Sequence, residues 1–241
     1  MTIETRRRVL CHVLPLLTRR YSHTTQSTAL ATPSSSSFSL NSRGFSNVLE
    51  FKTLQPLHSL LTPRDFGGKA ALIVNTASQC IYASQLQQLE TIHKRYNAKG
   101  LVVVAVPSND FGNTEPGTIE TILQRYAALN VTFPIAAMAH VRGDTAHPFF
   151  RKIADKYSVS VAPTWNFDKF LVDSYGELRA VFPNDTEPLD VQVVTEIEEV
   201  LEDVRKDWEA CEERSRVRDE EGRGSDDSRV KMDVKMDTLR S

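Results

Sequence analysis

Two short apolar runs, each followed by a polar or amphipathic segment, occupy the middle of the chain. The run ALIVNTA, residues 71–77, is continuous and contains β-branched residues, which is typical of a buried strand. Apolar residues then recur at helical spacing from Leu86 to Tyr96, and Gly100 follows where a helix would end. The run LVVVAVPS, residues 101–108, repeats the strand pattern. This strand–helix–strand order predicts two parallel strands joined by a right-handed crossover.

The following residues continue the alternation of helices and strands. We expect a helix in residues 118–130, a short extended piece in 132–138, a helix in 146–157 with Pro148 in its first turn, a hairpin in 167–182, and a final helix with an apolar stripe from Val193 to Val204. The order β, α, β, α, β, α, β, β, α predicts an α/β domain, with a mixed central sheet between flanking helices. This is a thioredoxin-like three-layer fold, and we place it at residues 47–204.

Both ends of the chain differ in composition from this domain. Residues 1–46 hold six arginines, no lysine and a single acid, and they are rich in serine and threonine. This composition is typical of a mitochondrial transit peptide, and RRYS at 19–22 and RGFS at 43–46 resemble processing sites. A disordered basic tail without an address is the alternative. Residues 205–241 carry mixed charges and few large apolar side chains, so we expect a frayed helix that passes into disorder.

Bulk composition limits the classes of function. The formal net charge of −2 gives no reason to expect a nucleic acid or an anionic membrane as partner. No apolar stretch approaches the roughly 18 residues that a transmembrane helix needs. Cys11, Cys80 and Cys211 lie far apart, which argues against a disulfide-stapled module. Neither these cysteines nor the six scattered histidines show a metal-ligand spacing, so we expect no metal and no bound cofactor.

Cys80 is the candidate for chemistry. It comes six residues after Val74, the last residue of the first apolar run, and just before the helix that carries Leu86. Free N–H groups and the dipole at a helix N-terminus lower the pKa of a cysteine and favour its reactive thiolate. A lone cysteine is also often a small residue of the core, and its position alone does not separate these two interpretations.

Four stretches that occur in a fixed order favour the reactive interpretation. They are VNTASQC at 74–80, VPSNDFGNTEPG at 106–117, AHPFF at 146–150 and WNFDKFLVDSYGEL at 165–178. Together they resemble the signatures of the glutathione peroxidase family, the thiol or selenol peroxidases of thioredoxin fold. The resemblance implies that the Cys80 thiolate attacks the O–O bond of hydrogen peroxide or of organic and lipid hydroperoxides. The resulting sulfenic acid is then restored by thiols.

The resemblance also implies partners for Cys80. Trp165 offers an indole N–H and Asn166 an amide, and both match the family's catalytic set. A core aromatic and a cap at a strand start are the structural alternatives for these two residues. Asp110 stands where the family usually has glutamine, and an ionised carboxylate would repel a thiolate. Three alternatives remain open for Asp110. It could point away and leave Asn109 as the donor, or it could be protonated or accept the peroxide proton. In the third alternative it only caps the next turn.

Two other departures concern the turn and the second thiol. Ile81 follows Cys80 where the family usually has glycine, and a β-branched residue would be strained at positive φ. The helix after the second signature has no resolving cysteine, so we expect a one-cysteine mechanism with glutathione or a thioredoxin-type protein as reductant. The segment from Pro148 to Trp165 lacks the insertion that tetrameric members use, which favours a monomer. A peroxide-sensing redox relay and an inactive interaction module are the alternative functions.

Overall fold

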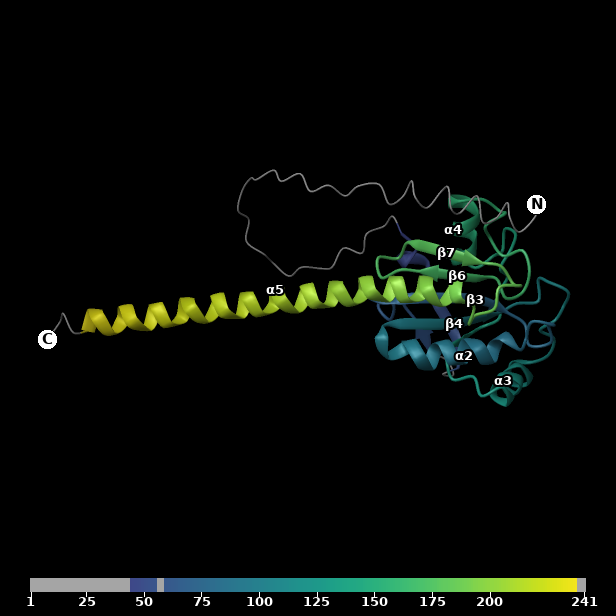
Figure 1. Ribbon diagram of the computed structural model, residues 1–241, viewed down its shortest axis with the longest axis horizontal. Helices are drawn as coiled ribbons and strands as arrows, with labels where there is room; N and C mark the ends of the chain where they lie inside the picture. The colour runs from purple at the N-terminus through teal and green to yellow at the C-terminus, as the bar shows by residue number, and fades with distance from the viewer. Residues whose placement is uncertain (1–43, 56–58, 238–241) are drawn as a thin grey trace. The chain divides into compact units, whose positions relative to one another are not determined.

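The computed structural model describes residues 44–55 and 59–237. A seven-stranded sheet in the order β2-β1-β5-β4-β3-β6-β7 forms its centre (Figure 1). The strands are β1 (Phe51–Gln55), β2 (Leu60–Leu61), β3 (Ala70–Thr76), β4 (Leu101–Pro107), β5 (Ile135–Ala136), β6 (Lys169–Val172) and β7 (Leu178–Phe182). The helices are η1 (Ser46–Val48), α2 (Gln85–Tyr96), η2 (Asn97–Lys99), α3 (Ile119–Ala128), α4 (Pro148–Lys156) and α5 (Val191–Asp237).

The two long apolar runs form the central strands. β3 and β4 pair in parallel along their whole length, with Thr76 opposite Pro107 at the end, as the crossover through α2 requires. β6 pairs with β3 in the antiparallel direction, with Lys169 opposite Val74. The carboxyl ends of β3 and β4 and the start of β6 therefore meet at one edge of the sheet. The loops at this edge carry the predicted site residues.

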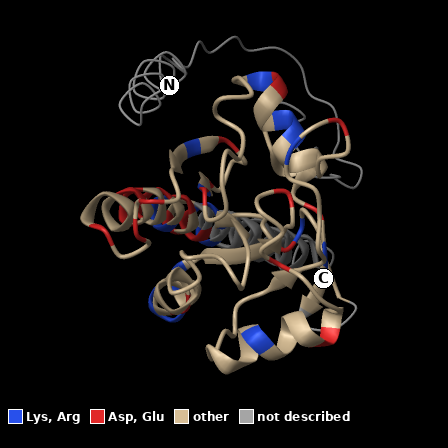
Figure 2. Ribbon diagram, turned by 90° about the vertical axis from the view of Figure 1, so that its right-hand side faces the viewer, with Lys and Arg blue, Asp and Glu red and all other residues tan. Residues whose placement is uncertain are grey.

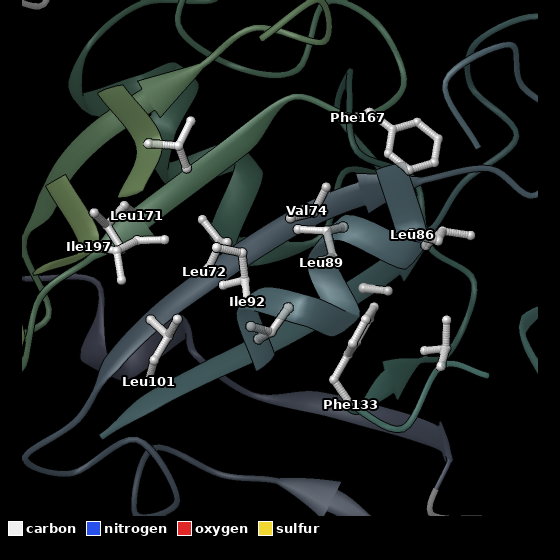
Figure 3. Close-up of a cluster of buried hydrophobic side chains, with 14 of the residues drawn as sticks. Leu72, Val74, Leu86, Leu89, Ile92, Leu101, Phe133, Phe167, Leu171 and Ile197 are labelled. Carbon is white, nitrogen blue, oxygen red and sulfur yellow. The ribbon is translucent and has the colours of Figure 1, made fainter. Parts of the chain in front are cut away.

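Alternate side chains of β3 enter cores on opposite faces of the sheet. Leu72 and Val74 pack with residues of α2 and α5 (Figure 3). Ala71 and Ile73 lie in a second cluster, which contains the aromatic residues of α4. Every residue of β3 is buried, as expected for a parallel strand that is covered on both faces. The layers are therefore helix, mixed sheet and helix, which is the fold class that the sequence predicts.

The folded domain begins earlier than the sequence predicts. The expected leader ends at residue 46, but Phe45 is fully buried. Its ring lies edge-on to Phe149 at 5.5 Å and stacks on Tyr157 at 6.1 Å, and its N–H donates to the carbonyl of Gly176. The apolar pattern misses this residue because a single phenylalanine after a basic, serine-rich stretch has no periodicity. The rest of the predicted leader, residues 1–43, lies outside the described residues.

The turn of the β6–β7 hairpin fits closely against this first segment. Gly176 has a φ of 80°, which L side chains rarely adopt. A Cβ at this position would lie 2.0 Å from Ser46 Oγ, and that hydroxyl donates to the carbonyl of Tyr175 at 3.4 Å. Glycine therefore permits both the turn and its contact with the first segment of the domain.

The last helix is longer than the sequence predicts. α5 continues to Asp237, where we expect a frayed helix and disorder beyond residue 205. Exposed ion pairs at helical spacing support the helix, since Arg205 contacts both Glu202 and Glu209. Pairs of opposite charge at this spacing favour a helix, so the mixed charges that suggest disorder can also stabilise one.

The described residues fall into two compact units that meet between Leu201 and Glu202. Acidic and basic residues are interspersed along the ribbon in Figure 2. Within the described part of the chain, no helix is both long enough and apolar enough to cross a membrane.

Candidate active site

Cys80 lies in the loop between β3 and α2. It is a free thiol and is only 9% exposed. Its N–H donates to the carbonyl of Ala77 at 3.3 Å, and its carbonyl accepts from the N–H of Ala83 at 3.0 Å. Further tight turns of this kind lead into α2, which begins at Gln85. Cys80 therefore lies at the start of a series of tight turns that precede α2, five residues before the first residue of the helix.

The amides that follow Cys80 are free to donate. Within the described residues, the N–H groups of Ile81 and Tyr82 reach no protein acceptor. Consecutive unpaired amides of this kind form a site that favours an anion. A thiolate at Cys80 therefore has two candidate backbone donors in its own turn, whereas the sequence places these donors at the helix N-terminus.

Ile81 fits its position without strain. Asn113, Asn130 and Phe167 are the non-glycine residues with positive φ in the described part of the chain, and Ile81 is not among them. Its side chain is 85% exposed. The backbone after Cys80 therefore does not need the glycine that stands there in the family, and a large apolar side chain projects into solvent beside the thiol.

Hydrogen bonds tie the Cys80 loop to the loop after β4. The N–H of Gln79, directly before Cys80, donates to the carbonyl of Thr114 at 2.9 Å. Thr114 Oγ1 in turn accepts from the side-chain amide of Asn166 at 2.8 Å. Gln79 and Asn166 are thus joined through Thr114, and the first, second and fourth sequence signatures converge at this edge of the sheet.

The Asn166 side chain is committed to this loop. It is fully buried, and its Nδ2 donates to Thr114 Oγ1 and, at 3.2 Å, to the carbonyl of Phe111. Both amide hydrogens are therefore used, while Oδ1 is buried without a partner. The sequence predicts that this amide donates to the thiolate, but in the structure it holds the second signature loop in place.

Trp165 keeps its indole N–H available. Its side chain is 44% exposed, and its ring lies 5.7 Å from the ring of Phe111, centroid to centroid. Its carbonyl accepts from Asn75 Nδ2 at 2.8 Å, which ties its backbone to the end of β3. No acceptor for the indole N–H occurs among the described residues, so this group can donate to a bound molecule.

The carboxylate of Asp110 turns toward residues 140–142. It accepts from Val141 N at 2.6 Å and Arg142 N at 3.3 Å, and His140 Nδ1 lies at 2.7 Å. Burial alone would raise the pKa of Asp110, but these hydrogen bonds outweigh it and hold the pKa below its usual value. Asp110 is therefore ionised at neutral pH, which argues against the protonated alternative. Asn109 Oδ1 accepts from the N–H of Glu115 at 2.7 Å.

Lys169 is a site neighbour that pattern analysis does not single out. It is fully buried at the start of β6, and its Nζ donates to the carbonyl of Phe167 at 2.8 Å and to that of Pro183 at 3.3 Å. Burial lowers its pKa to about 7, and nearby carboxylates, Asp168 first among them, only partly oppose this. Phe167, held at a φ of 70°, fixes the chain direction after Trp165 and Asn166. The signal in the sequence that could have identified Lys169 is a single lysine at the start of the apolar run KFLV.

A metal centre has no support in the described part of the chain, where no group of three or more His, Cys, Asp or Glu side chains could hold an ion. The groups that this edge of the sheet offers for chemistry are one thiol, two free amides and an indole.

Comparison with known proteins points to one family. The glutathione peroxidase family model matches residues 49–154. The glutathione peroxidase-like peroxiredoxin HYR1 of Saccharomyces cerevisiae is 36% identical over 163 residues, which cover 64% of this chain and 98% of the relative. The hydroperoxy fatty acid reductase gpx1 of Synechocystis sp. is 36% identical over 150 residues, which cover 57% and 86%. The crystal structure of Trgpx in apo form has a TM-score of 0.51 at 25% identity, over 65% of this chain and 95% of that one.

Proposed function

Because the chain belongs to the glutathione peroxidase family, we propose that it reduces hydrogen peroxide and organic hydroperoxides with Cys80 as the attacking thiolate. The observation that carries the proposal is the placement of this one thiol. Cys80 lies nine-tenths buried, beside two free amides, in a loop that is hydrogen-bonded to the second signature loop. Burial alone would suit a core residue, but the free donors suit a reacting group.

The proposed reaction needs donors for two oxygens and one sulfur. The Cys80 thiolate attacks one peroxide oxygen, and the O–O bond breaks. The other oxygen leaves with the electron pair and takes up a proton to give water or an alcohol, while Cys80 becomes a sulfenic acid. The free N–H groups of Ile81 and Tyr82 and the indole of Trp165 are the available donors. Asn166 and Asp110 act as positioning residues that hold the neighbouring loops.

An external thiol restores Cys80 in this proposal. Cys80 is the one cysteine between residues 47 and 204, and α3 contains none. A first thiol condenses with the sulfenic acid and releases water, and a second thiol cleaves the mixed disulfide by exchange. Glutathione is the expected reductant and a thioredoxin-type protein the alternative. A peroxide-sensing relay would differ in keeping a stable mixed disulfide with one protein partner.

Hydroperoxides with an apolar group are the preferred substrate class. Ile81 and Trp165, at 85% and 44% exposure, present apolar surface on the loops that carry and adjoin Cys80. Contact with such surface contributes about 25 cal/mol per Å² removed from water. The relative from Synechocystis is a hydroperoxy fatty acid reductase, which is in line with this preference.

We further propose that the enzyme acts as a monomer in mitochondria. The support is the Arg-rich, Ser-rich composition of residues 1–46 and the short segment from Pro148 to Trp165. The burial of Phe45 bears on how a leader is removed. A cut after Phe45, within RGFS, would delete a core residue. A cut after Tyr21, within the earlier RRYS, or another cut before Gly44 is compatible with the fold.

The test uses the full chain with Cys11→Ser and Cys211→Ser, so that Cys80 is the sole thiol. We expect peroxide to produce a sulfenic acid on Cys80 that a dimedone-type reagent traps, and glutathione to sustain turnover. Cys80→Ser in the same background is the matched control and should lose both. A Cys80→Ser variant that consumes peroxide as fast as its parent would refute the proposal. Replacing glutathione by a thioredoxin system in the same assay identifies the reductant.

A further inference from the structure

Glu115 is a fully buried carboxylate that the proposed reaction does not use. Its Oε2 accepts from the N–H of Ser78 at 2.7 Å, and its Oε1 accepts from the hydroxyl of Ser78 at 2.5 Å. The hydroxyl of Tyr126 lies 3.2 Å from Oε2, and Arg125 Nη1 lies 3.6 Å from Oε1. One side chain thus joins the Cys80 loop to the loop after β4 and to α3.

Burial of this charge is costly for the fold. Removing a carboxylate from water costs several kcal/mol unless ion pairs and hydrogen bonds compensate it. The compensation comes from three hydrogen bonds to the carboxylate and from the guanidinium of Arg125, which also donates to the carbonyl of Pro116 at 2.6 Å. An apolar residue of similar size would avoid this cost but would leave the N–H and hydroxyl of Ser78 and the hydroxyl of Tyr126 without this acceptor. The carboxylate is therefore better explained by what it holds than by stability alone.

The residue that Glu115 holds is two positions before Cys80. Ser78 gives both its donors to the carboxylate, and Gln79 gives its N–H to the carbonyl of Thr114, the neighbour of Glu115. The turn is then closed by the bond from Cys80 N–H to the carbonyl of Ala77. The N–H groups of Ser78 and Gln79, the two residues directly before Cys80, are thus anchored at Glu115 and at its neighbour Thr114.

The backbone of Glu115 also holds the loop after β4, to which Glu115 itself belongs. The N–H of Glu115 donates to Asn109 Oδ1 at 2.7 Å, beside Asp110. The thiol turn and the second signature loop therefore share one anchor, and a shift of Glu115 would move both.

We propose that Glu115 is a positioning residue of the peroxidase, which sets the Cys80 turn so that the thiolate faces its donors. This inference rests on the proposed function of Cys80. Misplacement of a reacting atom by about 1 Å can cost about a hundredfold in rate. Loss of the anchor should therefore slow the reaction of Cys80 with peroxide by about tenfold to a hundredfold while the domain stays folded.

Glu90 provides a matched control. It is also a buried carboxylate, and it accepts from Thr132 N at 2.7 Å and from Thr132 Oγ1 at 2.6 Å, with Lys94 at 3.1 Å. As at Glu115, one residue gives both its backbone N–H and its hydroxyl to the carboxylate and a basic side chain lies close, but none of these groups belongs to the Cys80 loop. Glu90→Gln and Glu115→Gln should therefore lower the unfolding midpoint by comparable amounts, and only Glu115→Gln should change the reactivity of Cys80.

The experiment measures Cys80 in the full chain with Cys11→Ser and Cys211→Ser. The first readout is the rate of alkylation by iodoacetamide against pH, and the second is the rate constant with hydrogen peroxide. Loss of positioning moves the midpoint of the alkylation profile upward, because the thiolate loses its donors. Loss of a nearby negative charge would by itself move the midpoint downward, so the direction separates positioning from simple electrostatics.

A gentler variant keeps the test decisive if Glu115→Gln folds poorly. Ser78→Ala removes the hydroxyl donor and leaves the backbone donor, and it should shift the midpoint in the same direction by a smaller amount. Either of two results would overturn the inference. The first is an unchanged or lowered midpoint together with a peroxide rate within twofold of the parent. The second is an equal change in Glu90→Gln. Failure of the proposed function looks different, since the parent would then not react with peroxide while the alkylation profiles would still differ.

Discussion

Deleting Phe45 together with the residues before it should destabilise the domain far more than deleting those residues alone. A chain that begins at Gly44 keeps the ring between Phe149 and Tyr157 and keeps its N–H bond to the Gly176 carbonyl. A chain that begins at Ser46 loses both. The difference between the two truncated chains is therefore the contribution of one buried residue to the core on the α4 face of the sheet.

The expected magnitude follows from the burial of Phe45. Truncation of a buried phenylalanine costs about 3–5 kcal/mol, and the lost backbone hydrogen bond adds about 1 kcal/mol. In a domain of this size, each kcal/mol lowers the melting temperature by about 2–4 °C. For a loss near 5 kcal/mol, the chain that begins at Ser46 should melt about 10–20 °C below the chain that begins at Gly44.

Thermal unfolding followed by circular dichroism measures this difference, with Phe45→Ala in the longer chain as the single-residue version. Val159→Ala is the control, because its side chain is 77% exposed and its removal should change the unfolding free energy by less than about 0.5 kcal/mol. Midpoints for the chains from Gly44 and from Ser46 that agree within about 2 °C would show that Phe45 does not belong to the core. The domain would then begin where the sequence predicts.

Three further outcomes follow from the site. Trp165→Phe keeps the ring contact with Phe111 but removes the indole N–H, so the peroxide rate constant should fall by about tenfold or more with little change in the melting temperature, and an unchanged rate would exclude the indole as a donor. Asp110→Asn should lower stability by about 1–2 kcal/mol at pH 7, and urea titrations should show that this gap closes as the pH falls below the usual Asp value near 3.8, because a lowered pKa contributes stability only above it. Because the pKa of Lys169 is lowered to about 7, the unfolded state binds more protons than the folded state between about pH 7 and 10.5. Wild type should therefore gain stability relative to Lys169→Met as the pH rises over that range. Parallel profiles of stability against pH would contradict the lowered pKa.

The sequence predicts the central part of the fold because its signals there are long. The runs that became β3 and β4 are continuous over seven residues each, and the helical stripes repeat over several turns. β1 and β2 are not predicted, because FKTLQ has no continuous apolar run or regular alternation and LL is too short to show either. The family comparison confirms the resemblance that the four signature stretches indicated.

The sequence predicts candidate members of the site but not their hydrogen bonds. Position and resemblance identify Cys80, Trp165 and Asn166, and the structure brings their loops to one edge of the sheet. The use of both Asn166 hydrogens by Phe111 and Thr114 depends on loop geometry that no spacing encodes. The partner of Asp110, His140, lies 30 residues away, and a tertiary contact of this kind is not apparent in a local pattern.

The contact between Ser46 and Tyr175 has a consequence for the order of events during synthesis. These residues are 129 positions apart, and ribosomes add about 5–20 residues per second. The hairpin against which the first segment of the domain packs is therefore synthesised about 6–26 s after that segment. Until then Phe45 has no native neighbour on β6 or β7, and the carbonyl of Gly176 to which its N–H donates has not been made. The segment that begins the domain thus completes its packing only after most of the domain has been synthesised.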